Sequence, residues 1–252
     1  MGAVRVGLLC GMTIAVGAPG ALADTSTSPN WAGYVVHRSH MRFSRVSAEW
    51  VQPSATCIPG RRTRSSIWVG LGGFRRDSKA LEQIGTQVDC SPTGAVHSAA
   101  WYELVPALSH AIGYRVTAGD LIAARVTVHG RQVRMSLTDL NRGWTYVKQV
   151  DAKTVDASSA DWIVESPSNC FIGPSCHRFA LANFGSVMFA AGSALSSSGY
   201  SGPIADPHWR ATRVVLRRSS AITQLATRFG SAAFPGPLQS YGTGFIVTYG
   251  SG

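Results

Sequence analysis

Short apolar runs alternate along the chain with polar and glycine-rich breaks, and this pattern indicates β-structure throughout. The runs are rich in β-branched and aromatic residues, and Gly, Ser, Pro or Asn separate them. Many short strands at a spacing of roughly 8 to 12 residues are typical of an all-β sandwich or barrel. We predict strands at 34–36, 46–51, 67–71, 121–129, 132–140, 181–189 and 245–249.

The segment Leu121–His129 shows the alternation most clearly. Its even-numbered positions from Ile122 to Val128 are apolar and share one face, whereas Arg125 lies opposite. A strand with one buried and one solvated face has this pattern. A helical spacing of apolar residues occurs at 222–229 and is too short to form a layer.

The first 23 residues have the features of a secretion signal. Arg5 precedes a mostly apolar stretch at 6–16, and small residues follow up to Ala23. We therefore expect cleavage after Ala23 and a freely secreted, extracellular protein. No other apolar run reaches the ~20 residues of a membrane helix, so no membrane anchor is expected. The remainder, 24–252, contains no linker-like tract and is expected to form a single domain.

Four cysteines remain outside the signal, an even number that suits an oxidising compartment. Three pairings are possible. We favour Cys57 with Cys90, which would tie two strand ends together, and Cys170 with Cys176, which would close a local loop. A zinc site is the alternative, but no two of these cysteines have the two-residue gap of finger-type sites, and no metal or cofactor is expected.

The formal net charge of +10 falls to +9 without the signal, which contains one arginine and no acidic residue. The arginines form small groups along the chain and no helix-length basic stripe, which argues against nucleic-acid binding. A solvated basic surface with nonspecific attraction to anionic cell walls fits better. We expect a monomer. The arginine groups are Arg61, Arg62, Arg64, Arg75, Arg76, Arg217 and Arg218.

Two of the strand-like stretches carry a polar residue that suits hydrolytic chemistry. Because side chains alternate across a strand, Gln83 faces the opposite way from Ile84, and Glu165 the opposite way from Trp162 and Val164. If Trp162 fills the space between two sheets, Glu165 faces away from the core. A carboxylate there can take a proton from water, and a primary amide can donate a hydrogen bond to an oxyanion.

These residues stand in an ordered set of motifs that resembles the eqolisins, or glutamic endopeptidases. This family comprises pepstatin-insensitive acid proteases with a catalytic Gln and Glu. The resemblance runs over most of the mature chain. It comprises Asn30-Trp31-Ala32-Gly33, Trp68-Val69-Gly70, Gln83-Ile84-Gly85, Ala100-Trp101-Tyr102-Glu103, Asp161-Trp162-Ile163-Val164-Glu165 and Asn183-Phe184-Gly185-Ser186-Val187.

The resemblance implies a lectin-like (concanavalin-like) sandwich of two antiparallel sheets and a secreted acid endopeptidase acting on proteins or peptides. By position, Gln83 and Glu165 match the catalytic pair, and Trp31, Trp68 and Glu103 match residues of the substrate cleft. Glu165 would deprotonate a water and later protonate the leaving amine, while Gln83 would hold the water and the oxyanion. A pKa of ~4.3 for an ordinary glutamate would explain activity in acid.

Among the departures of the chain from the family pattern, two remove carboxyl groups. Gly72 stands where an acidic residue is usual, and Ala99 replaces an aspartate, so two carboxyl groups near the catalytic glutamate are lost. Three other functions stay open. They are a lectin-like carbohydrate-binding module, a glycosidase that uses Glu103 and Glu165, and an inactive homologue that adheres to the cell wall.

Overall fold

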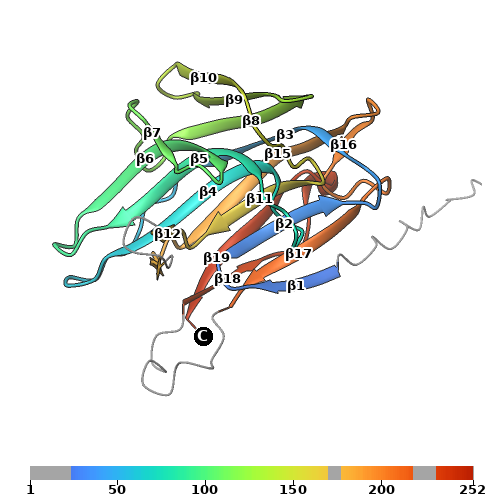
Figure 1. Cartoon of the computed structure of the whole chain (residues 1–252). Helices are drawn as coiled ribbons and strands as arrows, with labels where there is room; N and C mark the ends of the chain where they lie inside the picture. The colour runs from blue at the N-terminus through green and yellow to red at the C-terminus, as the bar shows by residue number, and fades with distance from the viewer. Residues whose placement is uncertain (1–23, 170–176, 218–230, 252) are drawn as a thin grey trace, which may run out of the picture.

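The computed structural model describes residues 24–169, 177–217 and 231–251, and these are all-β (Figure 1). No helix long and apolar enough to cross a membrane occurs in these segments. A 3-10 turn, Ser240–Gly242, lies between two of the strands. The strands are β1 Asp24–Ser28, β2 Trp31–His37, β3 Phe43–Val51, β4 Thr63–Gly72, β5 Leu81–Cys90, β6 Val96–Val105, β7 His110–Ile112, β8 Leu121–His129, β9 Gln132–Asp139, β10 Trp144–Asp151, β11 Ser159–Glu165, β12 Ser168–Asn169, β13 His177–Arg178, β14 Ala180–Leu181, β15 Ser186–Ser196, β16 Ser201–Pro203, β17 Arg210–Leu216, β18 Ser231–Pro235 and β19 Phe245–Ser251.

Within the described ranges, seventeen strands hydrogen-bond into one mostly antiparallel sheet that bends until it is nearly closed. A first run of neighbours has the order β7-β6-β5-β4-β11-β2-β17-β1. A second run has the order β10-β9-β8-β3-β15-β19-β18. The pairing of β17 with β18 joins the two runs. Strands far apart in sequence, such as β2 and β11, thereby become neighbours.

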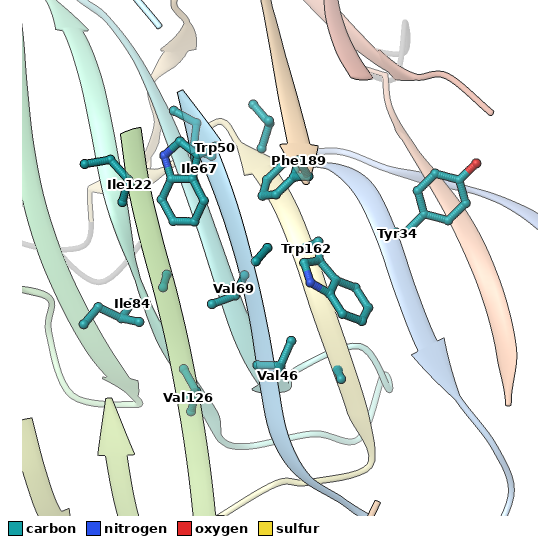
Figure 2. Close-up of a cluster of buried hydrophobic side chains, with 14 of the residues drawn as sticks. Tyr34, Val46, Trp50, Ile67, Val69, Ile84, Ile122, Val126, Trp162 and Phe189 are labelled. Atoms are coloured by element: carbon teal, nitrogen blue, oxygen red, sulfur yellow. The ribbon is translucent and has the colours of Figure 1, made fainter. Parts of the chain in front are cut away.

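The main core lies between the two runs (Figure 2). Ile67 of β4 and Trp162 of β11 come from the first run, and Trp50 of β3 and Phe189 of β15 come from the second. All four side chains are fully buried. Burying one such side chain contributes on the order of 1.5–3 kcal/mol.

The three buried tryptophans of this core, Trp50, Trp162 and Trp209, all have acceptors for their indole N–H groups. Trp50 Nε1 donates to Thr86 Oγ1 at 3.0 Å, and Trp162 Nε1 donates to the Ser47 carbonyl at 2.9 Å. An unpaired buried donor would cost about 1–3 kcal/mol. These bonds therefore let large aromatic side chains fill the core without that cost.

Most strand predictions are confirmed, including the buried even-numbered face of Leu121–His129. The prediction of one strand at 181–189 is wrong. The side chain of Asn183 accepts a hydrogen bond from the N–H of Gly185, whose φ is 66°, and the chain turns there. One short strand therefore ends at Leu181 and another begins at Ser186. The helical spacing at 222–229 lies outside the described residues.

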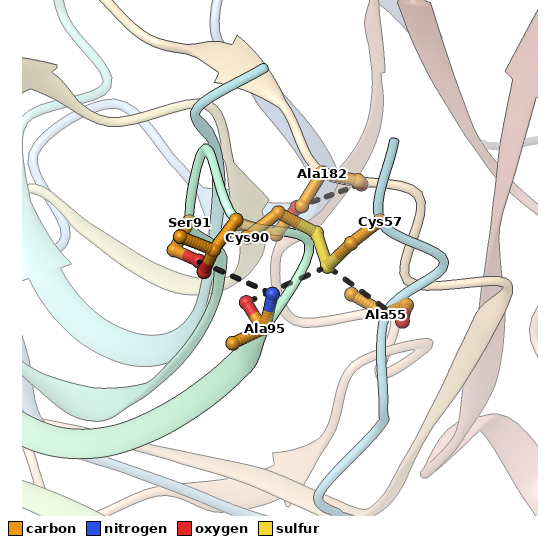
Figure 3. Close-up of a disulfide and its surroundings, with 8 residues drawn as sticks. Ala55, Cys57, Cys90, Ser91, Ala95 and Ala182 are labelled. Atoms are coloured by element: carbon orange, nitrogen blue, oxygen red, sulfur yellow. Dashed lines mark hydrogen bonds between the residues drawn. A yellow bond between two sulfur atoms is a disulfide. The ribbon is translucent and has the colours of Figure 1, made fainter. Parts of the chain in front are cut away.

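The predicted disulfide between Cys57 and Cys90 is confirmed (Figure 3). It ties the end of β5 to the segment between β3 and β4, and neither cysteine is then free to bind zinc. The loop that it closes spans 33 residues, which in the chain-entropy model contributes about 3–4 kcal/mol. The predicted pair Cys170 and Cys176 lies outside the described residues, as does the predicted signal.

Candidate active site

The first run of strands has a second face, turned away from the main core, and the residues that suit hydrolysis lie on it. A smaller apolar cluster covers this face and includes Trp68 of β4, Leu81 of β5 and Ile163 of β11. Gln83 alternates with Ile84, and Ile84 belongs to the main core. Glu165 likewise alternates with Val164 of the main core. We call this second face of β4, β5 and β11 the site face.

Each carboxylate oxygen of Glu165 accepts a hydrogen bond from a side-chain N–H. Asn30 Nδ2 donates to Oε1 at 2.9 Å, and Trp68 Nε1 donates to Oε2 at 2.9 Å. The strand register explains both contacts, because Glu165 pairs with Trp31 of β2 on one side and with Ser66 of β4 on the other. The carboxylate is fixed in orientation, and its side chain is only partly buried.

Asn30 is itself fixed by its neighbour in sequence. Ser28 Oγ donates to Asn30 Oδ1 at 3.2 Å and accepts hydrogen bonds from the backbone N–H groups of Asn30 and Trp31. The amide oxygen is thereby occupied, and the amide N–H₂ points toward Glu165. The sequence did not reveal this role for Asn30. The available signal was its place directly before Trp31 at the start of a strand.

Burial raises the pKa of Glu165 to about 7. The hydrogen bonds from Trp68, Asn30 and Trp31 oppose this shift because they favour the ionised form, and the nearby charge of Glu103 reinforces it. The expectation of an ordinary glutamate near 4.3 is therefore wrong. A carboxylate with this pKa is a stronger base than a solvated one, and it is mostly protonated in acid.

Gln83 lies next to Glu103 on the neighbouring strand β6, directly across the ladder. Its Nε2 donates to Glu103 Oε2 at 2.6 Å. Gln83 is 3% exposed, and its Oε1 has no hydrogen-bond partner among the described residues. Burial raises the pKa of Glu103, while the bond from Gln83 opposes the rise. Glu103 thus orients the Gln83 amide and leaves one of its N–H bonds for another acceptor.

Gln83 and Glu165 share the site face, but no hydrogen bond joins them in the described part of the chain. Two features connect them. The charge of Glu103, which holds Gln83, raises the pKa of Glu165. Trp68, on the strand between them, donates to Glu165. Room for Trp68 depends on Gly85, because a Cβ there would lie 2.6 Å from the Trp68 Cβ and 2.1 Å from the Ile67 carbonyl oxygen.

The tryptophans Trp31, Trp68 and Trp101 of the family motifs have different surroundings. Trp31 is partly exposed and packs edge-to-face on Trp68 with ring centroids 5.1 Å apart. Trp68 is fully buried, so its observed role is to hold Glu165. Trp101 lies beside Gly85 in the ladder, and its indole N–H has no partner among the described residues. Trp31 thus offers an exposed aromatic surface beside the carboxylate.

The profile of the Peptidase A4 family matches residues 29–227 of the chain. The chain belongs to this family, the eqolisins. It is therefore a glutamic endopeptidase, a hydrolase whose substrates are proteins or peptides. A comparison with curated proteins gives no match.

Solved structures of eqolisins resemble this chain. Scytalido-glutamic peptidase, solved with a transition state analog inhibitor, is 25% identical with a TM-score of 0.69, covering 88% of this chain and 98% of that chain. SCP-B, solved with the tripeptide Ala-Ile-His, is 23% identical with a TM-score of 0.65 over the same shares of 88% and 98%. Aspergilloglutamic peptidase from Aspergillus niger is 22% identical with a TM-score of 0.56, covering 75% and 99%. The last two likenesses are evidence of a shared fold.

In this eqolisin, a carboxyl group from another segment lies where an acidic residue at position 72 is usual. A Cβ on Gly72 would lie 2.6 Å from the Asp156 Cβ, so Asp156 fills that space. Asp156 Oδ2 accepts hydrogen bonds from Ser78 Oγ at 2.5 Å and from the N–H of Gly73 at 3.3 Å. These bonds and those from Ser158 lower the pKa of Asp156 despite its burial. Asp156 therefore occupies the space beside Gly72, where it acts on Glu82 and Asp161 and is not among the groups that shift the pKa of Glu165.

Two further carboxyl groups are buried close to Asp156. Burial raises the pKa of Glu82 to about 8, and it raises the pKa of Asp161 well above its usual range. Glu82 Oε2 and Asp161 Oδ1 have no hydrogen-bond partner in the described residues. Among those residues, no group of three His, Cys, Asp or Glu side chains is placed to hold a metal ion. We call Glu82, Asp156 and Asp161 the acid cluster.

Proposed function

We propose that the chain is a secreted endopeptidase in which Glu165 and Gln83 activate one water molecule for direct hydrolysis. The observation that carries the proposal is the fixing of both side chains on one face. Asn30 and Trp68 each hold one oxygen of Glu165, and Glu103 holds the Gln83 amide. Such preorganised donors are what transition-state stabilisation requires.

The mechanism needs no covalent intermediate. Ionised Glu165 takes a proton from water, and the resulting hydroxide forms a bond to the scissile carbonyl carbon. The free N–H of Gln83 donates to the oxyanion that develops. Protonated Glu165 then gives its proton to the amide nitrogen, the C–N bond breaks, and an acid and an amine leave.

The raised pKa of Glu165 changes the expected pH dependence. With a pKa of about 7, roughly 1% of the free enzyme carries ionised Glu165 at pH 5. Since the base must be ionised, we expect kcat/KM to rise with pH up to about 7. The optimum should therefore be weakly acidic to neutral instead of strongly acidic.

Secretion and the finer fold also belong to this proposal. The disulfide between Cys57 and Cys90 supports an oxidising, extracellular compartment. The packing of the two strand runs across one core supports a lectin-like sandwich of two antiparallel sheets. The hydrogen bond from Gln83 to Glu103 favours an amide-holding role for that glutamate over the acid or base role that a glycosidase would need.

The test compares the wild type with Glu165→Gln and Gln83→Ala. Each mature protein is incubated with a denatured protein from pH 2 to 8 with pepstatin present, and products are identified by mass spectrometry. Glu49→Gln is the matched control, because Glu49 is also a partly buried glutamate on a strand, β3. We expect cleavage by the wild type and the control, no cleavage by Glu165→Gln, and a loss of at least about 100-fold in kcat for Gln83→Ala.

Cleavage that survives in Glu165→Gln would overturn the proposed catalytic pair. Folding of each variant is checked by tryptophan fluorescence, so that loss of activity is not confused with loss of structure.

A further inference from the structure

A basic cavity lies where β2 ends and β11 begins, at the opposite end of this strand pair from Glu165. Its volume is about 640 Å³, and it lies between the turn 38–42 and the segment that follows β4. Its cationic lining consists of Arg38, Arg42 and Arg75, with His37 and His40 beside them, and no carboxylate is among the lining residues. The cavity therefore suits an anion.

The strand register gives the separation between this cavity and Glu165. Glu165 pairs with Trp31, and Ser159 pairs with His37, which lines the cavity. These six residues correspond to about 20 Å at a rise of about 3.3 Å per residue. An extended peptide has the same rise, so about six residues of substrate span the distance.

Phe74 connects the cavity to the site face. It packs against the apolar cluster that contains Trp68 and Leu81, and it also lines the cavity. Its ring lies 5.1 Å from the ring of His37. One aromatic side chain thus forms part of both surfaces.

The three arginines differ in the hydrogen bonds and ion pairs that their guanidinium groups make. Arg38 donates to the His208 carbonyl, and Arg75 forms an ion pair with Asp77 at 3.1 Å. Arg42 is exposed, and in the described part of the chain its guanidinium has no hydrogen bond or ion pair. Arg42 is therefore the cation most open to a ligand.

The backbone of the same turn is strained. His40 has a φ of 61°, in the left-handed region that residues other than glycine seldom occupy. Such conformations cluster at ligand-binding sites.

We propose that this cavity is a substrate subsite for a carboxylate, so that the enzyme prefers peptides with Asp or Glu about six residues from the scissile bond. The inference rests on the proposed function and adds a substrate class to it. Ordinary Asp and Glu side chains are ionised above a pH of about 4 and then carry the charge that the arginines would bind. An anion entering between the arginines would bind Arg42 first.

The experiment uses pairs of internally quenched peptides around one cleavable core, taken from the digest of the denatured protein. The two peptides of a pair differ at one position, which is Asp in one peptide and Asn in the other. This position is varied from pair to pair between four and eight residues from the scissile bond, on either side. When the varied position is about six residues from the scissile bond on one side, we expect kcat/KM to be about three- to fivefold higher for the Asp peptide than for the Asn peptide. The difference should lie mainly in KM. The preference should shrink in 0.5 M NaCl because salt screens exposed charges.

In Arg42→Gln, the ratio of kcat/KM for the Asp peptide to kcat/KM for the Asn peptide should fall close to one. Arg134→Gln, at an exposed arginine of β9 in the second run, is the matched control and should keep the wild-type ratio. A wild-type ratio of one, with cleavage that still needs Glu165, would overturn the subsite and leave the proposed function standing.

Binding of the same peptides to Glu165→Gln, measured by fluorescence anisotropy, separates the two proposals. Tighter binding of the Asp peptide that is lost with Arg42→Gln supports the subsite even if no peptide is cleaved. Equal binding of the Asp and Asn peptides to Glu165→Gln, with or without Arg42→Gln, rejects the subsite.

Discussion

The acid cluster predicts that this protein loses stability as the pH rises from acid to neutral. Glu82 and Asp161 are buried, each with a carboxyl oxygen that lacks a partner in the described residues. Glu82 meets the backbone N–H and the charge of Asp156 and the more distant charge of Arg42, while Asp161 meets the hydroxyl of Ser159 and the charges of Asp156 and Glu82. Ionisation of either group would therefore place an uncompensated charge in the interior.

The magnitude follows from the pKa of Glu82, which is 4.5 in its ordinary state and about 8 in the folded protein. Because the folded protein binds this proton more tightly than the unfolded chain, the protonated Glu82 contributes its full stabilisation below pH 4.5. This contribution is lost as the pH rises toward 8. At pH 7 the loss from Glu82 alone is about 3 kcal/mol. Domains are stable by only about 5–15 kcal/mol, so this is a large fraction.

Other carboxyl groups also change the stability with pH, some in the same direction as Glu82 and one in the opposite direction. The raised pKa values of Asp161, Glu165 and Asp89 add losses in the same direction, and that of Asp89 is raised to about 6 by burial. The lowered pKa of Asp156 has the opposite sign, because its contribution is lost as the pH falls below about 3.8. We therefore expect maximum stability near pH 4.

The assay is urea unfolding followed by tryptophan fluorescence at pH 4, 5, 6, 7 and 8, with the wild type, Glu82→Gln and the control Glu49→Gln. The glutamine keeps an oxygen for the N–H of Asp156 but cannot ionise. From pH 4 to 7, Glu82→Gln should lose about 3 kcal/mol less stability than the wild type, while the control follows the wild type. A wild-type stability that stays flat or rises over this range, or equal slopes for wild type and Glu82→Gln, would refute the reasoning.

Three further predictions concern the site and the fold. Asn30→Ala removes a donor that favours the ionised catalytic carboxylate, so the acid limb of kcat/KM against pH should move up by about 1 pH unit; an unmoved limb would contradict this. Gly85→Ala inserts a methyl group 2.1 Å from a carbonyl oxygen and should destabilise the protein by about 3 kcal/mol in urea unfolding, whereas a change below about 0.5 kcal/mol would show that β4 and β5 can separate there. Replacing both Cys57 and Cys90 by Ala opens the 33-residue loop and should cost about 3–4 kcal/mol; an unchanged urea midpoint would argue against the disulfide.

The faces of the key strands could be predicted from sequence because alternation is a local property. Gln83 and Glu165 were assigned to the side opposite Ile84 and Trp162, and the structure confirms both assignments. The strand at 181–189 was mispredicted because an apolar run does not show that a side-chain hydrogen bond at Asn183 will turn the chain.

The sequence by itself determined that the chain is all-β and which side chains share a face, since a period of two residues depends only on the backbone. It also supported the Cys57–Cys90 pair, through an even number of cysteines and the neighbouring strand ends. Only the tertiary structure decided which strands adjoin. Asn30 and Glu165 are 135 residues apart in the chain, and their hydrogen bond exists because β2 pairs with β11. The raised pKa of Glu165 has the same origin, because desolvation is imposed by neighbours that no local pattern specifies.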